Sequence, residues 1–353
     1  MEAEPIQFLW RHYEDLLQPA REAVARFVGA AQRDLVFATN ATVGVNSVVR
    51  SLELKPGDEI LTTSHDYNAC RNVLVETARD ARAKVVVADI PFPVQSRDQI
   101  IEAVLGKVTR RTRLAMIDHV TSNTAIVLPV QRLVRELESR GVDTLVDGAH
   151  APGMVPLDLN KLGSAYYTAN LHKWVCAPKG SAFLWARSDK QKGLQPAVIS
   201  HGHNRPRPGF TPFQDRFDWA GTFDFTAWLC VPKAIEFMDG VLPGGWTELR
   251  RRNHQLAVEG RRIICEKLDL TPACPESMLG SMATISLPAR FQGAPASGKI
   301  DREQLRLYDE FGIEVPLCRV GNPPRRYFRI SAQIYNIIEE YRYLSAALAA
   351  LLP

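Results

Sequence analysis

The six cysteines of this 353-residue chain are scattered, and no two of them form a close C-x-x-C pair. Structural zinc sites and disulfide-rich small domains both need closely spaced ligands or thiols, so we expect neither of them and no metal. Isolated thiols are typical of a reducing compartment, and we therefore expect the protein to be cytoplasmic.

The chain also lacks a hydrophobic run of the length that crosses a bilayer. Its first residues, MEAEPIQFLWRHYEDLL, are acidic and then amphipathic. A secretion signal has the opposite plan, a basic start followed by an apolar stretch. We expect no interaction with a membrane.

Neither sign of charge dominates, because 43 Lys and Arg stand against 39 Asp and Glu, for a net charge of +4. No dense basic block occurs, so the sequence does not indicate a nucleic-acid partner. Hydrophobic residues make up 46% of the chain, which is enough for a sizeable core. The length indicates one large domain and a smaller one.

Short β-forming runs alternate with helical patterns over the first two thirds of the chain. The predicted strands are 35–39, 59–63, 84–90, 113–120, 143–147, 165–169 and 181–186. The predicted helices between them are 42–52, 68–82, 97–107 and 129–140. This alternation predicts an α/β fold, a mostly parallel seven-stranded sheet sandwiched by helices. The last two strands have no helix between them, so we expect a mixed sheet. A helix is predicted from Ile6, with Pro19 starting a second helical piece.

The pattern changes after about residue 225, and the cluster LPGGW at 242–246 breaks it. The predicted elements that follow are a helix at 246–268, a strand at 283–287, a loop near 293–298, a helix at 301–311, strands at 313–317 and 327–331 and a helix at 337–351. We therefore predict a large domain at 1–240 and a smaller α+β domain at 241–353.

Polar residues follow several predicted strands, and ligands of open parallel sheets bind beyond these carboxyl ends. Thr42 and its neighbours precede a helix, so they indicate either a phosphate cradle of backbone amides or a simple helix cap. Tyr67, in SHDYNA, is placed either to stack on a planar ring or to sit in a turn, with His65 nearby. His119, Thr121 and Ser122 form a third polar cluster.

Asp147 ends a predicted buried strand, where an unpaired carboxylate would be costly. It either pairs with a cation or caps the turn at Gly148, and His150 is placed to face the same pocket. Lys173, between His172 and Trp174, is an unusual lysine because desolvation in such a setting yields a nucleophilic amine. A lysine and an acid beyond neighbouring strands are the arrangement that binds pyridoxal phosphate.

Seven motifs in this order resemble one family. They are TNATVGVN, SHDYNA, HVTSNTAIVLPV, VDGAHAPG, NLHKW, AGTFD and YFRISAQIYN. Together they resemble the class V aminotransferases, which are fold-type I pyridoxal phosphate enzymes. The resemblance is strongest to the isopenicillin N epimerase-like branch, which is related to cysteine desulfurases and C–S lyases, and it covers nearly the whole chain. Ordered recurrence of several motifs is far more specific than any one alone.

The resemblance implies roles for the reacting end of the site. Lys173 matches the lysine that bonds the cofactor aldehyde, and Asp147 matches the acid on the pyridine nitrogen. His150 matches a contact to the ring hydroxyl, and Tyr67 matches the side chain that stacks on the ring. Ser122 stands where desulfurases have an asparagine near the cofactor.

The resemblance also implies ligands for the cofactor phosphate. Ala41 and Thr42 match a backbone cradle, whereas Asn170 and His172 match side-chain ligands. Thr222, in AGTFD, matches a residue that reaches the cofactor phosphate of the neighbouring subunit, which implies a homodimer with shared active sites.

Arg329, in YFRIS, matches the arginine that binds the carboxylate of an amino-acid substrate, since its planar fork fits a carboxylate. The implied reaction is epimerisation or racemisation at the α-carbon. A C–S lyase, a cysteine desulfhydrase or desulfurase and an aminotransferase are the alternatives, because all of them start from the same carbanion. Cys318 is predicted to be a strand-end cysteine rather than a sulfur carrier.

Relatives of this family usually have more sequence, including a glycine-rich segment, ahead of the first helix. This difference motivates a second hypothesis, a cofactor-binding protein that has lost turnover.

Overall fold

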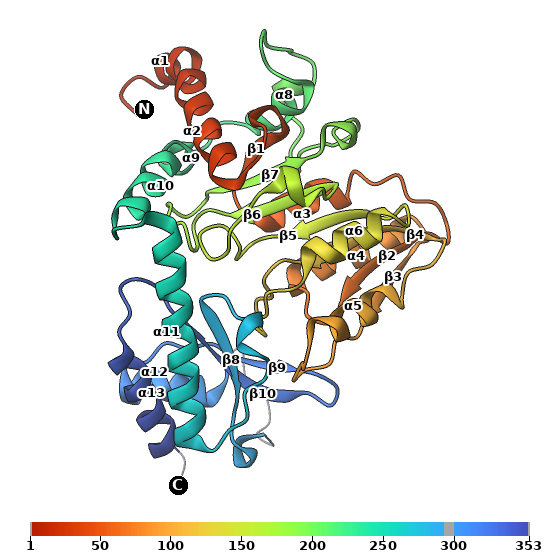
Figure 1. The fold of residues 1–353 in the computed structure, drawn as a ribbon. Coiled ribbons are helices and arrows are strands. Elements are labelled where there is room, and N and C mark those ends of the chain that lie inside the picture. Colours follow the sequence, from red (N-terminus) through yellow and green to blue (C-terminus); the bar gives the residue numbers. More distant parts are fainter. Residues whose placement is uncertain (1, 293–299, 352–353) are drawn as a thin grey trace.

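The computed structural model describes residues 2–292 and 300–351, and a seven-stranded sheet forms the centre of the larger lobe (Figure 1). Its strands are β1 (Leu35–Ala38), β2 (Glu59–Thr63), β3 (Lys84–Ala88), β4 (Thr112–Asp118), β5 (Asp143–Asp147), β6 (Tyr166–Asn170) and β7 (Ala182–Ala186). They lie in the order β1-β7-β6-β5-β4-β2-β3. In this spatial order, β6, β5, β4, β2 and β3 are parallel to one another. Strand β7 is antiparallel to both of its neighbours, β1 and β6. The predicted mixed, mostly parallel sheet is therefore confirmed.

Helices cover both faces of this sheet, as predicted, with a separate apolar cluster on each face. Helices α3 (Ala41–Val49) and α4 (Asn68–Asp80) pack on one face, together with α8 (Pro212–Asp218). Helices α2 (Tyr13–Val28), α5 (Arg97–Leu105) and α6 (Val130–Glu138) pack on the other. In β1, Val36 belongs to one cluster and its neighbour Phe37 to the other, as alternation in a strand requires.

The N-terminal helical region does not divide at Pro19, contrary to the prediction. A short α1 (Pro5–Gln7) and a π-helical turn at Phe8–His12 lead into α2, and Pro19 lies inside α2. An interior proline costs about 3 kcal/mol because it removes a hydrogen bond and crowds the preceding turn. The buried face of α2, which includes Leu17 and Val24, supplies the packing that offsets this cost.

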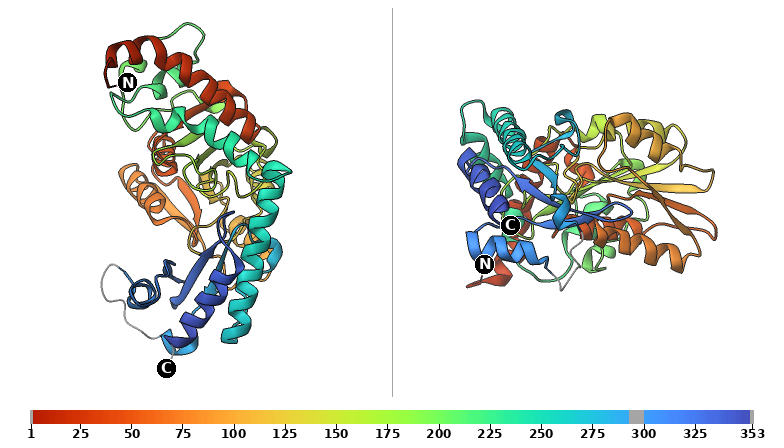
Figure 2. Two further views of the ribbon diagram at one scale, coloured as in Figure 1. Left: turned by 90° about the vertical axis from the view of Figure 1, so that its left-hand side faces the viewer. Right: turned by 90° about the horizontal axis from the view of Figure 1, so that it is seen from below.

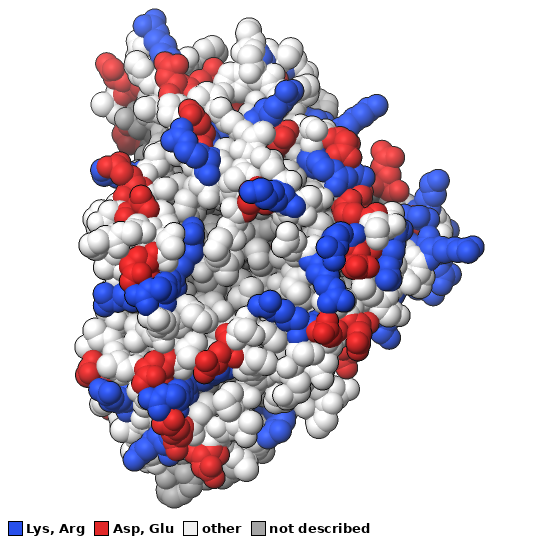
Figure 3. All heavy atoms as spheres, viewed as in Figure 1, with Lys and Arg blue, Asp and Glu red and all other residues white. Residues whose placement is uncertain are grey.

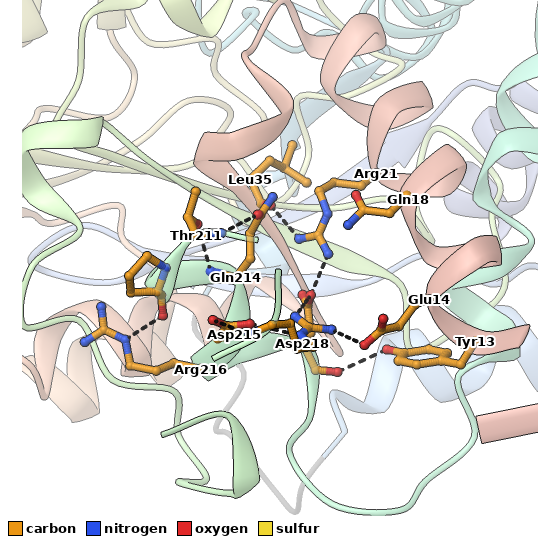
Figure 4. A network of polar contacts seen from close by, with 12 residues as sticks. Tyr13, Glu14, Gln18, Arg21, Leu35, Thr211, Gln214, Asp215, Arg216 and Asp218 are labelled. Atoms are coloured by element: carbon orange, nitrogen blue, oxygen red, sulfur yellow. Dashed lines mark hydrogen bonds and ion pairs between the residues drawn. The ribbon is translucent and has the colours of Figure 1, made fainter. Parts of the chain in front are cut away.

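A buried ionic network fastens α2 to α8 (Figure 4). Arg21 is fully buried and its Nη2 lies 2.7 Å from Oδ2 of Asp218, while its Nη1 donates to the carbonyl of Leu35. Arg207 also binds Asp218 at 2.7 Å and extends to Glu14 on α2. Residues nearly two hundred positions apart are thus joined in the core.

The smaller lobe contains a three-stranded antiparallel sheet in the order β8-β10-β9. Its strands are β8 (Met282–Ser286), β9 (Leu317–Val320) and β10 (Arg325–Ser331). The long helix α11 (Gly245–Leu268) runs from the large lobe past this sheet and packs along α13 (Ile338–Ala350) (Figure 2). Helix α12 (Arg302–Phe311) completes the lobe.

The strand predicted at 313–317 is misplaced, because β9 begins only at Leu317. Pro316 has no amide hydrogen to donate to a sheet, so pairing starts after it. The loop predicted near 293–298 lies outside the described residues.

The domain boundary at 240 and 241 stays a prediction. It lies at the end of α10 (Val231–Gly240), which follows the short helices α7 (Leu159–Leu162) and α9 (Thr226–Leu229) along the chain.

Basic and acidic side chains are interspersed over most of the face in Figure 3, with basic side chains gathered at its right-hand tip. Within residues 2–292 and 300–351, no helix combines the length and the apolar character needed to cross a bilayer.

Candidate active site

The carboxyl ends of β1, β4, β5 and β6 meet at one edge of the large sheet, because these strands run in the same direction. Asp147 is the last residue of β5, and Asn170 is the last residue of β6. The loop after β6 carries Lys173, and the turn after β5 carries His150. Residues predicted from separate sequence motifs therefore share one region.

Lys173 and His150 are in direct contact. The Lys173 amine lies 3.0 Å from Nε2 of His150, and the Trp174 indole donates to Nδ1 of the same ring at 3.3 Å. Because Nδ1 accepts from the indole, Nε2 is the ring nitrogen that faces the Lys173 amine.

Burial acts on the two groups in the same direction. Burial lowers the pKa of the Lys173 amine; Asp147 opposes this effect, and Arg329 adds to it. The pKa of His150 is held well below its usual range, first by burial and then by Lys173 and Arg329. These influences also indicate that Lys173 lies within electrostatic reach of both Asp147 and Arg329.

Asp147 is buried and accepts two hydrogen bonds. The Ala149 amide donates to Oδ1 at 2.9 Å, and the Cys70 thiol donates to Oδ2 at 3.3 Å. Burial raises the pKa of the Asp147 carboxyl, whereas these two donors and Lys173 lower it. Burial outweighs these donors, so the pKa of this carboxyl stays above its ordinary value.

The first turn of helix α3 presents backbone amides, which are hydrogen-bond donors of the kind that a phosphate needs. The Ala41 amide donates to Oδ1 of Asn170 at 2.8 Å, and the Val43 amide donates to Oδ1 of Asn40 at 2.9 Å. The Thr42 amide, also in the first turn, has no acceptor within the helix. Nδ1 of His172 is buried without a hydrogen-bond partner in the described part of the chain. These groups fit a phosphate at the helix N-terminus.

Arg329 extends from β10 of the small lobe to the loop after β4. Its Nη1 donates to the carbonyl of Ser122 and, at 3.3 Å, to the Ser122 hydroxyl. Its Nε is buried and has no partner within residues 2–292 and 300–351. Thr284 of β8 and Cys318 of β9 both donate to the carbonyl of Asn123, at 2.9 and 3.5 Å. All three strands of the small sheet thus contact this loop.

Three predicted candidates lie apart from the Lys173 pocket. Tyr67 is 48% exposed at the start of α4, and no contact joins it to Lys173 or Asp147 within the described residues. Thr222 is exposed and lines a pocket of about 310 Å³ beside Val43. His65 is buried, with Nδ1 lying 2.8 Å from Oγ1 of Thr124.

The sequence indicated His119, but the structure turns it away from the site, since its Nδ1 lies 2.8 Å from the Tyr167 hydroxyl. The sequence reasoning missed Asp118, Cys70 and Trp174, of which Cys70 contacts Asp147 and Trp174 contacts His150.

Where the chain is described, no three His, Cys, Asp or Glu side chains are placed to hold a metal ion.

Comparisons with known proteins identify relatives of this chain. The family model for class-V aminotransferases matches residues 9–286. An isopenicillin N epimerase from Streptomyces clavuligerus is 34% identical over 99% of this chain and 88% of its own length. A putative L-cysteine desulfhydrase 1 from Oryza sativa subsp. japonica is 31% identical over 98% of this chain and 76% of its own.

The fold resembles that of a cysteine desulfurase from Thermococcus onnurineus NA1, with a TM-score of 0.77 at 19% identity. That likeness covers 96% of this chain and 84% of the other one.

Proposed function

This chain belongs to the class-V aminotransferase family, and from that premise we propose that it acts at the α-carbon of an amino-acid substrate. It is a pyridoxal phosphate enzyme, and the bound cofactor supplies a ring that withdraws electrons from the α-carbon. The chain's own residues bind this ring, orient the substrate and move protons.

One observation carries the proposal: the Lys173 amine lies 3.0 Å from Nε2 of His150, and burial lowers its pKa, which favours the uncharged form. An uncharged amine is the nucleophilic form that bonds an aldehyde, and the same atom accepts a proton once a substrate has displaced it. His150 keeps Lys173 oriented and, as a neutral donor, is suited to the cofactor's ring hydroxyl.

The remaining residues fix the two ends of the cofactor. Asp147, which ends β5, would pair with the pyridine nitrogen and keep it protonated. The amide of Thr42, with Ala41 beside it, and the side chains of Asn170 and His172 would hold the phosphate at the start of α3. Tyr67 would stack on the ring only after it turns inward from its exposed position.

Arg329 would bind the substrate carboxylate. Its guanidinium is already directed to the site by Ser122, and its buried Nε lacks a partner in the described residues. A carboxylate between Nε and Nη would satisfy this donor and fix the α-carbon relative to Lys173. Ser122 would act indirectly, because its carbonyl and hydroxyl hold the Arg329 guanidinium in position.

Among the reactions of this family we propose epimerisation, which the isopenicillin N epimerase relative supports. A C–S lyase is the second candidate, supported by the desulfhydrase relative. Sulfur uptake of the desulfurase type has less support, because it needs a mobile thiolate. Cys318 lies in β9, donates to Asn123, and burial raises the pKa of its thiol to about 11.

Incubation with L- and D-amino acids in deuterated water tests the proposal. α-Deuterium incorporation with inversion, detected by chiral chromatography and mass spectrometry, is the expected result. Sulfide with pyruvate would select the lyase. Absence of α-proton exchange, sulfide, pyruvate and keto acid from the whole panel, with a reconstituted cofactor, would overturn the assignment to α-carbon chemistry.

We also propose a homodimer with shared sites, in which Thr222 serves the partner's cofactor phosphate. Sedimentation gives the oligomeric state. Mixing of Lys173→Ala and Thr222→Val subunits then tests the sharing. A mixed dimer would contain one site with both residues intact and would regain activity, whereas a Thr222 that serves its own subunit would leave no intact site.

A further inference from the structure

Asp118 ends β4 directly beside Asp147 at the end of β5. The two residues are paired in the parallel register, so their side chains leave the sheet on the same face. Asp118 is only 3% exposed, and its Oδ2 has no hydrogen-bond partner among the residues that the structure describes. The sheet therefore buries a second carboxyl group next to the one assigned to the cofactor nitrogen.

Within the described ranges, no Lys or Arg side chain forms an ion pair with this second carboxyl group. Arg71 lies nearby, but its Nε and Nη2 are committed to Asp66, at 2.6 and 2.7 Å. Asp66 also accepts from Thr62 and adds its own negative charge to the cluster. Lys173 contacts His150 at 3.0 Å, and Asp147 acts on the pKa of its amine more strongly than Asp118 does. Burial of two adjacent carboxyl groups with no ion pair to Asp118 favours a proton on one of them.

The hydrogen bonds decide which group keeps the proton. Asp147 accepts from the Ala149 amide and from the Cys70 thiol, and both donors favour its ionised form. For Asp118, the groups that favour ionisation are its own backbone amide and the more distant Arg71. Burial and the charges of Asp147 and Asp66 outweigh them and raise the pKa of Asp118 well above its ordinary value.

We propose that Asp118 is a positioning residue that carries its proton. Asp147, to which the Cys70 thiol donates a hydrogen bond, then alone presents negative charge to the pyridine ring of the cofactor. This role rests on the proposed function, but the proton on Asp118 is a property of the chain itself. A neutral Asp118 supports Asp147 without competing for the pyridine nitrogen.

Infrared spectroscopy of protein labelled with ¹³C at the aspartate carboxyl tests the proton without any activity assay. At pH 7 we expect a protonated-carboxyl band in the wild type, with and without pyridoxal phosphate. The band should vanish in Asp118→Asn and persist in Cys70→Ser. A wild type without this band, or a band that survives in Asp118→Asn, would overturn the proposal.

Cofactor affinity, followed by quenching of tryptophan fluorescence, tests the positioning role. Asp118→Asn replaces a neutral acid by a neutral amide and should bind pyridoxal phosphate within about threefold of the wild type. Asp147→Asn loses a charge-assisted bond and should bind about 10- to 100-fold more weakly. Cys70→Ser keeps a donor and should stay near the wild type, whereas Cys70→Ala should bind a few-fold more weakly.

Equal losses in Asp118→Asn and Asp147→Asn would show that Asp118 is charged and would contradict the proposal. A wild type that binds no pyridoxal phosphate would contradict the proposed function instead, and the infrared result would still stand. Circular dichroism of each variant separates loss of folding from loss of affinity. The infrared band of the wild type is measured on the unaltered protein and does not depend on the folding of any variant.

Discussion

The amine of Lys173 and Nε2 of His150 lie 3.0 Å apart, and the Trp174 indole fixes the far side of the same imidazole ring. Since the indole donates to Nδ1, the other ring nitrogen, Nε2, faces the Lys173 amine. Burial lowers the pKa of this amine and so favours its uncharged, nucleophilic form.

The pKa of Lys173 should respond in opposite directions to two substitutions. Asp147 raises this pKa and Arg329 lowers it, so Asp147→Asn should lower it further and Arg329→Met should bring it back toward 10.5. Competitive labelling of the cofactor-free protein with acetic anhydride across pH measures this value. Lys161 is an internal comparison, because its pKa is raised by the hydrogen bond to Asp158. Shifts of the same sign in both variants would contradict the geometry.

Arg329→Lys should lower kcat/KM by about 10- to 100-fold, mainly through KM. A lysine keeps the positive charge but loses the planar fork that binds a carboxylate through two hydrogen bonds. Steady-state kinetics on the best amino acid of the panel measures the effect. Arg325→Lys is the matched control, because Arg325 is exposed on the same strand β10.

The corresponding amine, which lacks the carboxylate, separates recognition of the substrate from general damage to the site. The wild type and Arg329→Lys should bind and process this amine equally well, because the amine offers no carboxylate for the side chain at position 329 to bind. A loss of the same size on the amino acid and on the amine would mean that Arg329 supports the fold of the site rather than the substrate.

The strands of the large sheet were readable from the sequence because burial on both faces makes short, continuous apolar runs. LVFA and AFLWA, which form β1 and β7, are examples. Pro19 was misread because a local rule treats proline as a helix start. Packing of α2 against the sheet and α10 decides that position, and this packing is absent from any local pattern.

The candidate site was predictable where motifs carried it and failed where it depended on strand pairing. Asp118 and His119 are consecutive, so one faces Asp147 and the other faces Tyr167. The sequence does not say which face of β4 adjoins the cofactor, because this depends on the register with β5. The sequence alone therefore favours the more reactive-looking histidine over the aspartate. Cys70 was missed for a different reason, because its contact with Asp147 joins α4 to the end of β5, 77 positions further along the chain.

Asp218→Asn should destabilise the fold by about 3–5 kcal/mol. The substitution leaves Arg21 fully buried without its ionic partner and also removes the charge that Arg207 binds. Urea unfolding measures the change. Glu22→Gln removes the exposed ion pair with Arg26 on the same helix and should cost no more than about 0.5 kcal/mol. Similar losses in both variants would mean that burial of the Arg21 pair contributes nothing.

His119 should make the wild type more acid-sensitive than His119→Asn, a substitution that keeps a polar partner for Tyr167. Burial lowers the pKa of His119 to about 4 from 6.5. Between these values the unfolded chain binds a proton that the folded protein does not, so stability falls as pH drops through this window. Between pH 7 and pH 5, the wild type should lose roughly 2 kcal/mol more than the variant.

Urea unfolding at the two pH values measures this difference, in which the contributions of the unchanged groups cancel. His12→Asn, the same substitution at an exposed histidine on the first helical turns, is the control. Parallel pH dependence in wild type and His119→Asn would mean that His119 accepts its proton as readily in the fold as outside it. The contact with Tyr167 at 2.8 Å would then have to open at acidic pH.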